Sequence, residues 1–231
     1  GIPQNSEDAV LEVFFRGVRA LGIDEGAAKG DVKLTESGPV IGEIAARLSG
    51  GYMSGWTYPY ASGVDVTAAA LNIAVGLPPG DLVPRFRRIA AERAFISIPG
   101  RITALEGVDE AAEDTRVKDI FVTVKPGDTV TFPENNVQKC GNVIAAADDR
   151  DSARTAASDA AKRIRLRLEP GNPDTLRFLT GEKCPRAPDA FTLNSPVNRK
   201  TLEEMPDIIP RPGTMSPARG RAGSFGIILL P

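Results

Sequence analysis

The sequence has 231 residues, of which 42% are hydrophobic and 25% are charged, and its formal net charge is −2. This balance is ordinary for a globular protein, and it gives no electrostatic case for a nucleic acid or an anionic membrane as partner. The absence of histidine excludes Ser–His–Asp and Cys–His catalysis and His-ligated metals, and two cysteines without CxxC spacing argue against a disulfide framework or structural zinc.

The sequence also bears on the compartment. No apolar run reaches the roughly 18 residues of a membrane span, and nothing resembles a signal peptide. A cytoplasmic location is therefore expected.

The chain begins GIPQNSEDAV, without Met, which we interpret as a processed product or a fragment. The oligomeric state, including a homo-oligomer, stays open.

The first third of the chain predicts a helix, a hairpin and a second helix. Apolar residues at helical spacing over 10–21 predict a helix capped by Ser6. A β-hairpin is expected over 30–47, and a loop rich in Gly, hydroxyl and aromatic residues follows over 49–63. Asp65 is expected to cap the second helix.

After Pro78-Pro79 the pattern changes to short strands separated by turn residues. An Ala-rich helix is expected over 150–163, and the expected strands are 92–99, 118–124, 141–147 and 164–170. The expected fold class is α+β, with an antiparallel sheet in the second domain. The domains are predicted as 1–79, a strand-rich domain over 80–182, and a Pro-rich extended tail over 183–231.

The hairpin carries the chemistry. With a three-residue turn at 36–38, Asp31 on one strand faces Glu43 on the other. Like charges in that position repel unless a cation or a shared proton lies between them. Two interpretations stay open: the carboxylates bind a hard ion such as Mg²⁺, or they are solvated on an exposed hairpin with Lys33 as counter-charge.

The segment GDVKLTESGPVIGEIAARLSGGYMSGWTYPYASGVDVTAAALNIAVG resembles the last part of the catalytic domain of the ATP-grasp superfamily, which includes biotin carboxylase, carbamoyl phosphate synthetase and phosphoribosylamine–glycine ligase. The metal site of that superfamily has an acidic residue followed, about twelve residues later, by E-x-N-x-R. Asp31 and Glu43 match the two acids, Arg47 matches the Arg, and Ala45 stands in the Asn position. The order of the later pieces, PGR at 99–101 and GNVIA at 141–145, is also similar.

The resemblance implies an ATP-dependent ligase that activates a small carboxylate as an acyl-phosphate, which an amine then attacks. The implied cofactors are ATP and Mg²⁺, with Asp31 and Glu43 as ligands of the Mg²⁺ that bridges the nucleotide phosphates, and with Glu43 able to span two ions. Arg47 is implied to stabilise the transferring phosphoryl group or to bind the carboxylate substrate.

Two departures from the family pattern qualify these expectations. Ala45 cannot coordinate a metal, and no glycine-rich phosphate-binding loop with a Lys precedes the hairpin. An N-terminal ATP-grasp segment or subunit is therefore the expected partner, and the chain alone is expected to be inactive. The alternatives are an ATP-dependent enzyme similar to biotin carboxylase, and a non-catalytic binding or assembly module on a decayed ATP-grasp scaffold.

Overall fold

The computed structural model describes residues 4–135, 137–180 and 224–230. The chain divides into two compact units, the first made of residues 1–88 and 218–231 and the second of residues 89–217. The expected Pro-rich tail lies outside the described residues except for 224–230. No helix in the described part of the chain is long and apolar enough to cross a membrane.

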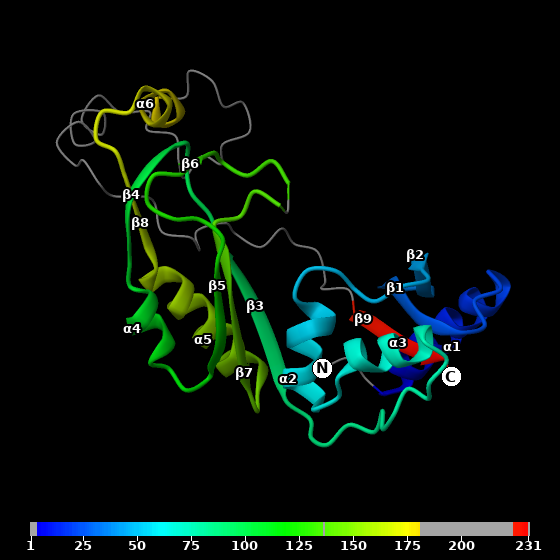
Figure 1. Ribbon diagram of the computed structural model, residues 1–231. Helices are drawn as coiled ribbons and strands as arrows, with labels where there is room; N and C mark the ends of the chain where they lie inside the picture. The colour runs from blue at the N-terminus through cyan, green and yellow to red at the C-terminus, as the bar shows by residue number, and fades with distance from the viewer. Residues whose placement is uncertain (1–3, 136, 181–223, 231) are drawn as a thin grey trace. The chain divides into compact units, whose positions relative to one another are not determined.

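The first unit is built on a three-stranded antiparallel sheet of order β2-β1-β9 (Figure 1). The helix α1 (Gln4–Ala20) precedes the strands β1 (Gly26–Thr35) and β2 (Gly38–Ala45), and β9 (Ser224–Leu230) pairs with the other side of β1. Because α1 already includes Gln4, Ser6 lies inside the helix, and its predicted capping role is wrong.

The helix α1 packs against the hairpin through a small core. Phe14 and Val18 of α1 are buried against Ala28 and Val32 of β1, with the partly buried Ile41 and Ile44 of β2 around them. Two glycines permit this approach. A Cβ on Gly30 would lie 2.2 Å from the Phe14 ring, and one on Gly17 would lie 2.4 Å from Ile44 Cδ1. The close packing of β1 and β2 against α1 therefore requires glycine at positions 17 and 30.

The hairpin register differs from the prediction near the turn and agrees with it at the site. The expected three-residue turn at 36–38 is wrong: the turn has two residues, 36 and 37, and Thr35 pairs with Gly38. An irregularity between Asp31 and Val32 then shifts the register, so Asp31 pairs with Glu43 as predicted. One extra residue on β2, Gly42, makes up the difference.

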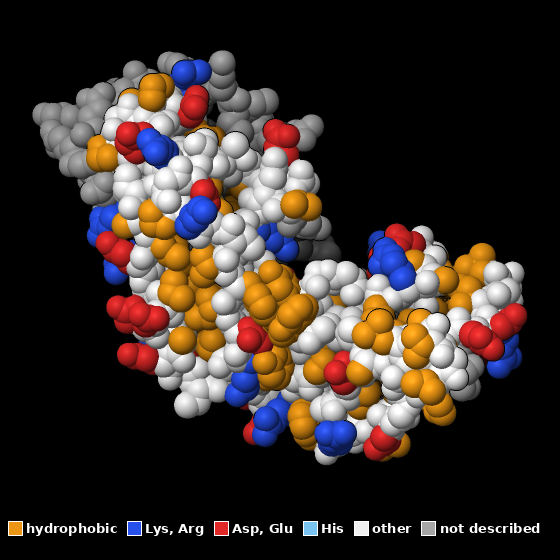
Figure 2. All heavy atoms as spheres, in the orientation of Figure 1, with side chains coloured by type: hydrophobic (Ala, Val, Ile, Leu, Met, Phe, Trp, Pro, Cys, Tyr) orange, Lys and Arg blue, Asp and Glu red, His pale blue; other side chains and the backbone are white. Residues whose placement is uncertain are grey.

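After the hairpin come a short π-helix η1 (Met53–Thr57) and the helices α2 (Tyr58–Ser62) and α3 (Val66–Ala74). The predicted cap at Asp65 is confirmed, since its side chain accepts a hydrogen bond of 2.9 Å from the Ala68 N–H. Figure 2 shows hydrophobic side chains at the surface over α3, where Leu71 is 64% exposed.

The second unit contains two small antiparallel sheets, of orders β3-β7-β5 and β6-β4-β8. Their strands are β3 (Ile89–Phe95), β4 (Gly100–Glu106), β5 (Val117–Val122), β6 (Thr129–Val130), β7 (Gly141–Ala147) and β8 (Arg165–Leu168). The helices are α4 (Val108–Ala112), α5 (Arg150–Arg163) and α6 (Pro173–Leu179). The predicted bounds of β7 and α5 are confirmed, whereas β4, β6, α4 and α6 were not predicted.

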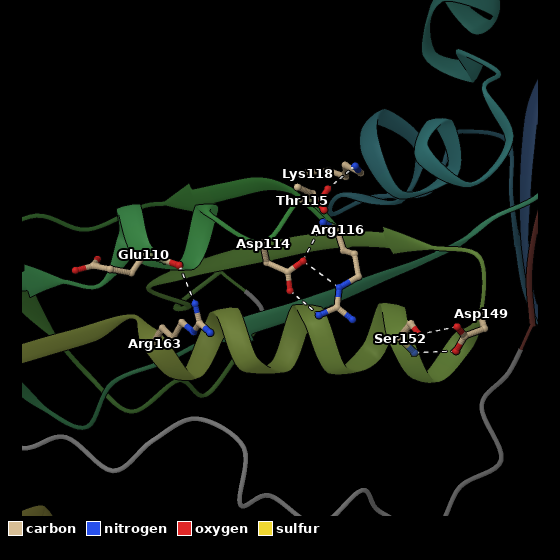
Figure 3. A network of polar contacts seen from close by, with 8 residues as sticks. All are labelled: Glu110, Asp114, Thr115, Arg116, Lys118, Asp149, Ser152 and Arg163. Atoms are coloured by element: carbon tan, nitrogen blue, oxygen red, sulfur yellow. Dashed lines mark hydrogen bonds and ion pairs between the residues drawn. The ribbon is translucent and has the colours of Figure 1, made fainter.

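The helix α5 lies along the β3-β7-β5 sheet (Figure 1). Asp149 begins the helix by accepting hydrogen bonds from the Ser152 N–H at 2.9 Å and the Ser152 hydroxyl at 2.6 Å (Figure 3). Its alanines recur at helical spacing and are buried, which lets the helix approach the sheet closely. The core beneath includes Phe95, Val143 and Ile164, so this unit has a hydrophobic core of its own.

Candidate functional site

The two predicted carboxylates are brought together by the hairpin. Asp31 of β1 and Glu43 of β2 are direct partners in the antiparallel ladder. Their side chains are 41% and 53% exposed, so both reach solvent from the same part of the sheet. This placement is the one that the sequence predicted.

A lysine that was not predicted as part of the site lies between the two acids. Lys29 Nζ is 2.9 Å from Asp31 Oδ1 and 3.0 Å from Glu43 Oε1, while the Lys29 side chain is only 10% exposed. Hydrogen bonds to Asp31 and then to Glu43 raise the pKa of Lys29 above its ordinary value, so the ammonium stays charged. Lys29, and not Lys33, supplies the counter-charge in the hairpin.

A signal for Lys29 was present in the sequence. Lys29 stands two residues before Asp31 on the same strand, and residues two apart in a strand project from the same face. The expected hairpin began at residue 30, which left Lys29 outside it. Lys29 pairs with Ala45 in the ladder, and Ala45 occupies the position where the family pattern has Asn. Because the side chain of Ala45 has no polar atom, the Lys29 ammonium has the two acids as its partners.

Arg47 lies at the margin of this cluster. Its Nη2 is 3.8 Å from Glu43 Oε1, its Nη1 donates a 3.1 Å hydrogen bond to the Leu48 carbonyl, and its side chain is 58% exposed. The strand β2 ends at Ala45, so Arg47 belongs to the bend that follows. Arg47 therefore contacts Glu43 alone among the predicted site residues, and Lys29 is the group that links the two acids.

The loop after the hairpin buries two hydroxyl groups. The side chains of Ser49 and Ser54 have no hydrogen-bond partner among the described residues, although Ser49 is 7% and Ser54 is 4% exposed. Ser54 lies in η1, a π-helix, and such turns are frequent at functional sites. Tyr52 and Trp56 flank it with their rings edge to face, 5.3 Å apart.

Together, Lys29, Asp31, Glu43 and Arg47 form what we call the charge cluster. It contains two acids and two bases on one end of a hairpin. Carboxylate oxygens are the ligands that Mg²⁺ prefers, and the guanidinium of an arginine suits a phosphate or a carboxylate. The arrangement can bind a hard cation and the anionic groups attached to it.

The second unit holds polar groups that are already paired. Asp114 accepts bonds from Arg116 Nε at 2.9 Å and Nη2 at 2.6 Å, and Arg163 Nη1 donates to the Glu110 carbonyl at 3.0 Å (Figure 3). A hollow of about 390 Å³ lies beside α4 and α5 and is lined by charges of both signs. Burial raises the pKa of the Cys140 thiol to about 11, which makes it a poor nucleophile.

Comparison with known protein families points in the same direction as the sequence. Residues 94–169 match the family described as L-amino acid ligase C-terminal domain 2. Among curated proteins, the uncharacterized protein y4rH of Sinorhizobium fredii is 29% identical over 164 residues, which cover 71% of this chain and 34% of that protein. The chain thus spans about a third of the length of this relative.

Solved structures identify the fold. L-amino acid ligase from Bacillus licheniformis aligns with a TM-score of 0.61 and 17% identity, covering 73% of this chain and 42% of the ligase. Phosphoribosylglycinamide synthetase from Anaerococcus prevotii aligns with a TM-score of 0.67 and 15% identity, covering 73% and 43%. The resemblance to the C-terminal part of ATP-grasp ligases and the predicted α+β fold class are confirmed.

Proposed function

We propose that this chain supplies the carboxylate part of the active site of an ATP-grasp ligase that joins a carboxylate to an amine. The observation that carries the proposal is the pairing of Asp31 with Glu43, at the family spacing, on a fold shared with ligases. The ligase would form an acyl-phosphate from ATP and a small carboxylate substrate, and an amine would then displace the phosphate. The match to an L-amino acid ligase domain supports an amino acid as one of the substrates.

The residues present fit a magnesium ion that is held mainly by other groups. Asp31 and Glu43 offer carboxylate oxygens, and no group of three His, Cys, Asp or Glu side chains in the described part of the chain can hold a metal. Mg²⁺ sites that handle nucleotides commonly use one or two carboxylates and complete the shell with phosphates and water. When bound, the ion would neutralise charge on the phosphates.

The remaining residues of the charge cluster have separate roles in this proposal. Lys29 holds one oxygen of each acid and so fixes both carboxylates against their mutual repulsion. Arg47, exposed at the margin, binds the phosphoryl group or the substrate carboxylate. The ATP-binding loop and adenine pocket belong to an N-terminal part, supplied within one polypeptide or as a subunit. The relative y4rH is long enough to include such a part, because this chain aligns with only 34% of it.

Glu43→Gln tests the proposal in the assembled enzyme, meaning this chain together with its ATP-binding part. Loss of a metal-ligating charge should lower Mg²⁺-dependent ADP formation by at least about 100-fold, because even groups behind the ligands typically cost 10–100-fold. Glu36→Gln, in the turn of the same hairpin, is the matched control and should retain activity. Equal activity and Mg²⁺ dependence in the two variants would refute the site.

Two other functions are separated by the same assay. A carboxylase similar to biotin carboxylase would need bicarbonate for ADP formation, whereas an amine ligase would need an amine acceptor. A non-catalytic module on a decayed scaffold is favoured by Ala45 in the Asn position and by the lysine between the acids. For that module, no combination of carboxylate, amine and bicarbonate would yield ADP above background.

A further inference from the structure

Lys29 changes what the hairpin can bind. Its ammonium lies at nearly equal distances, 2.9 and 3.0 Å, from one oxygen of each acid. A divalent ion that bridged the same two oxygens would need the place that the ammonium takes. Lys29 therefore supplies a positive charge at the position that a bound cation would occupy.

The buried position of Lys29 hinders movement of its ammonium away from the two acids. Its side chain is 10% exposed, and it extends from β1, the central strand of the β2-β1-β9 sheet. The two acids are about half exposed, although Asp31 Oδ1, the oxygen beside the ammonium, is itself buried. If a metal displaced the ammonium from the two acids, the charged lysine would remain buried without partners of opposite charge, which is costly.

We propose that Lys29 acts as an internal cation that prevents the free chain from binding a divalent metal at Asp31 and Glu43. The proposal deepens the proposed function and depends on it for the place of the metal. A metal then binds only together with the phosphates of the nucleotide, which supply the negative charge that Lys29 has cancelled. Metal binding becomes conditional on nucleotide binding.

The charges in the cluster support this order of events. Asp31 and Glu43 carry two negative charges, and Lys29 and Arg47 carry two positive charges, so the four side chains are neutral together. A neutral cluster attracts a lone divalent ion weakly, and a lysine beside it adds repulsion. Removal of one positive charge leaves a net negative cluster with both carboxylates available.

The test is a titration of the complete 231-residue chain with Mn²⁺ alone, followed by the electron paramagnetic resonance signal of the free ion. The wild-type chain should bind with a dissociation constant of about 1 mM or weaker. Lys29→Met should bind at least about tenfold more tightly, because a unit charge that repels the divalent ion is gone. Lys29→Arg, which keeps the charge, should resemble the wild type.

Three further variants locate the effect. Lys33→Met removes an exposed lysine from the same strand and should leave the affinity for Mn²⁺ unchanged. Adding Glu43→Gln to Lys29→Met should abolish the gain. If Lys29→Met does not fold, Lys29→Gln takes its place, and addition of Mn²⁺ should raise the unfolding temperature of either neutral variant but not that of the wild type.

Submillimolar binding of Mn²⁺ by the wild-type chain at a site lost in Glu43→Gln would overturn the inference, as would equal affinities for the wild type and the neutral variants. These outcomes leave the ligase proposal intact, because they concern the metal in the absence of ATP. Conversely, the Mn²⁺ titrations could give the expected results while Glu43→Gln leaves the activity of the assembled enzyme unchanged. That outcome would refute the ligase site alone.

Discussion

Replacement of Gly30 by alanine tests how closely α1 approaches the strand that carries Lys29 and Asp31. The added Cβ would lie 2.2 Å from Phe14 Cε2 and 2.4 Å from Phe14 Cδ2. Unstrained carbon contacts lie at about 3.5–4.0 Å, so the ring must move by more than 1 Å. Phe14 is 2% exposed and packs against Val18 and Val32, which leaves the ring little free space.

The expected cost follows from that overlap. Forcing an extra methyl group into a filled core typically costs about 1–3 kcal/mol. For a unit of this size, each kcal/mol lowers the unfolding temperature by roughly 4–8 °C, so a fall of about 4–24 °C is expected. Gly17→Ala should cost less, because the atoms that its Cβ meets are the ends of flexible side chains, Ile44 and Ile41.

Urea unfolding followed by tryptophan fluorescence measures the effect. The chain has one tryptophan, and Trp56 lies in η1 of the first unit, so the signal reports on that unit. Gly50→Ala is the control, since nothing lies within 4 Å of its added Cβ. Phe14→Leu combined with Gly30→Ala should cost less than the sum of the two single changes. A Gly30→Ala variant as stable as the control, or simple additivity with Phe14→Leu, would refute the reasoning.

Two further predictions concern stability elsewhere. Ser54→Ala removes a buried hydroxyl that has no partner in the described part of the chain, so it should stabilise the first unit by up to about 1 kcal/mol in urea unfolding; an equal loss would contradict this. Hydrogen bonds from Arg116 lower the pKa of Asp114 to about 2, below its ordinary 3.8, so the carboxylate stabilises the fold above about pH 4 and this contribution disappears as pH falls toward 2. Asp114→Asn should therefore cost about 1 kcal/mol at pH 7, after allowance for solvent screening, and nothing near pH 2; a difference independent of pH would contradict the assignment.

The pairing of Asp31 with Glu43 was predictable although part of the reasoning was wrong. The sequence suggested a three-residue turn, and the hairpin has a two-residue turn. The extra residue at Gly42 restores the predicted register before the acids are reached. A bulge depends on how both strands pack against α1, and alternation within one strand does not reveal it. On the turn side of the bulge, Ile41 packs against the core and Val40 is exposed.

Elements whose sequence carries its own signals were predicted best. Asp65 and Asp149 mark helix starts by local hydrogen bonds, and Asp65 was recognised. The strand β4 was missed because it pairs with β8, about sixty residues later, and is positioned by that partner. Lys29 was missed for a similar reason: its role depends on a residue of the opposite strand, Glu43, as well as on Asp31.

The strand β9 has a consequence for how the chain is made. It completes the sheet of the first unit by pairing with β1, although nearly the whole chain separates Thr35 from Ser224. Domains generally fold during synthesis in order from the N-terminus, at about 5–20 residues per second. The first unit breaks this order, because one edge of β1 stays unpaired for on the order of tens of seconds while the second unit emerges and folds. The unit that carries the charge cluster is therefore completed only after the second unit has been synthesised.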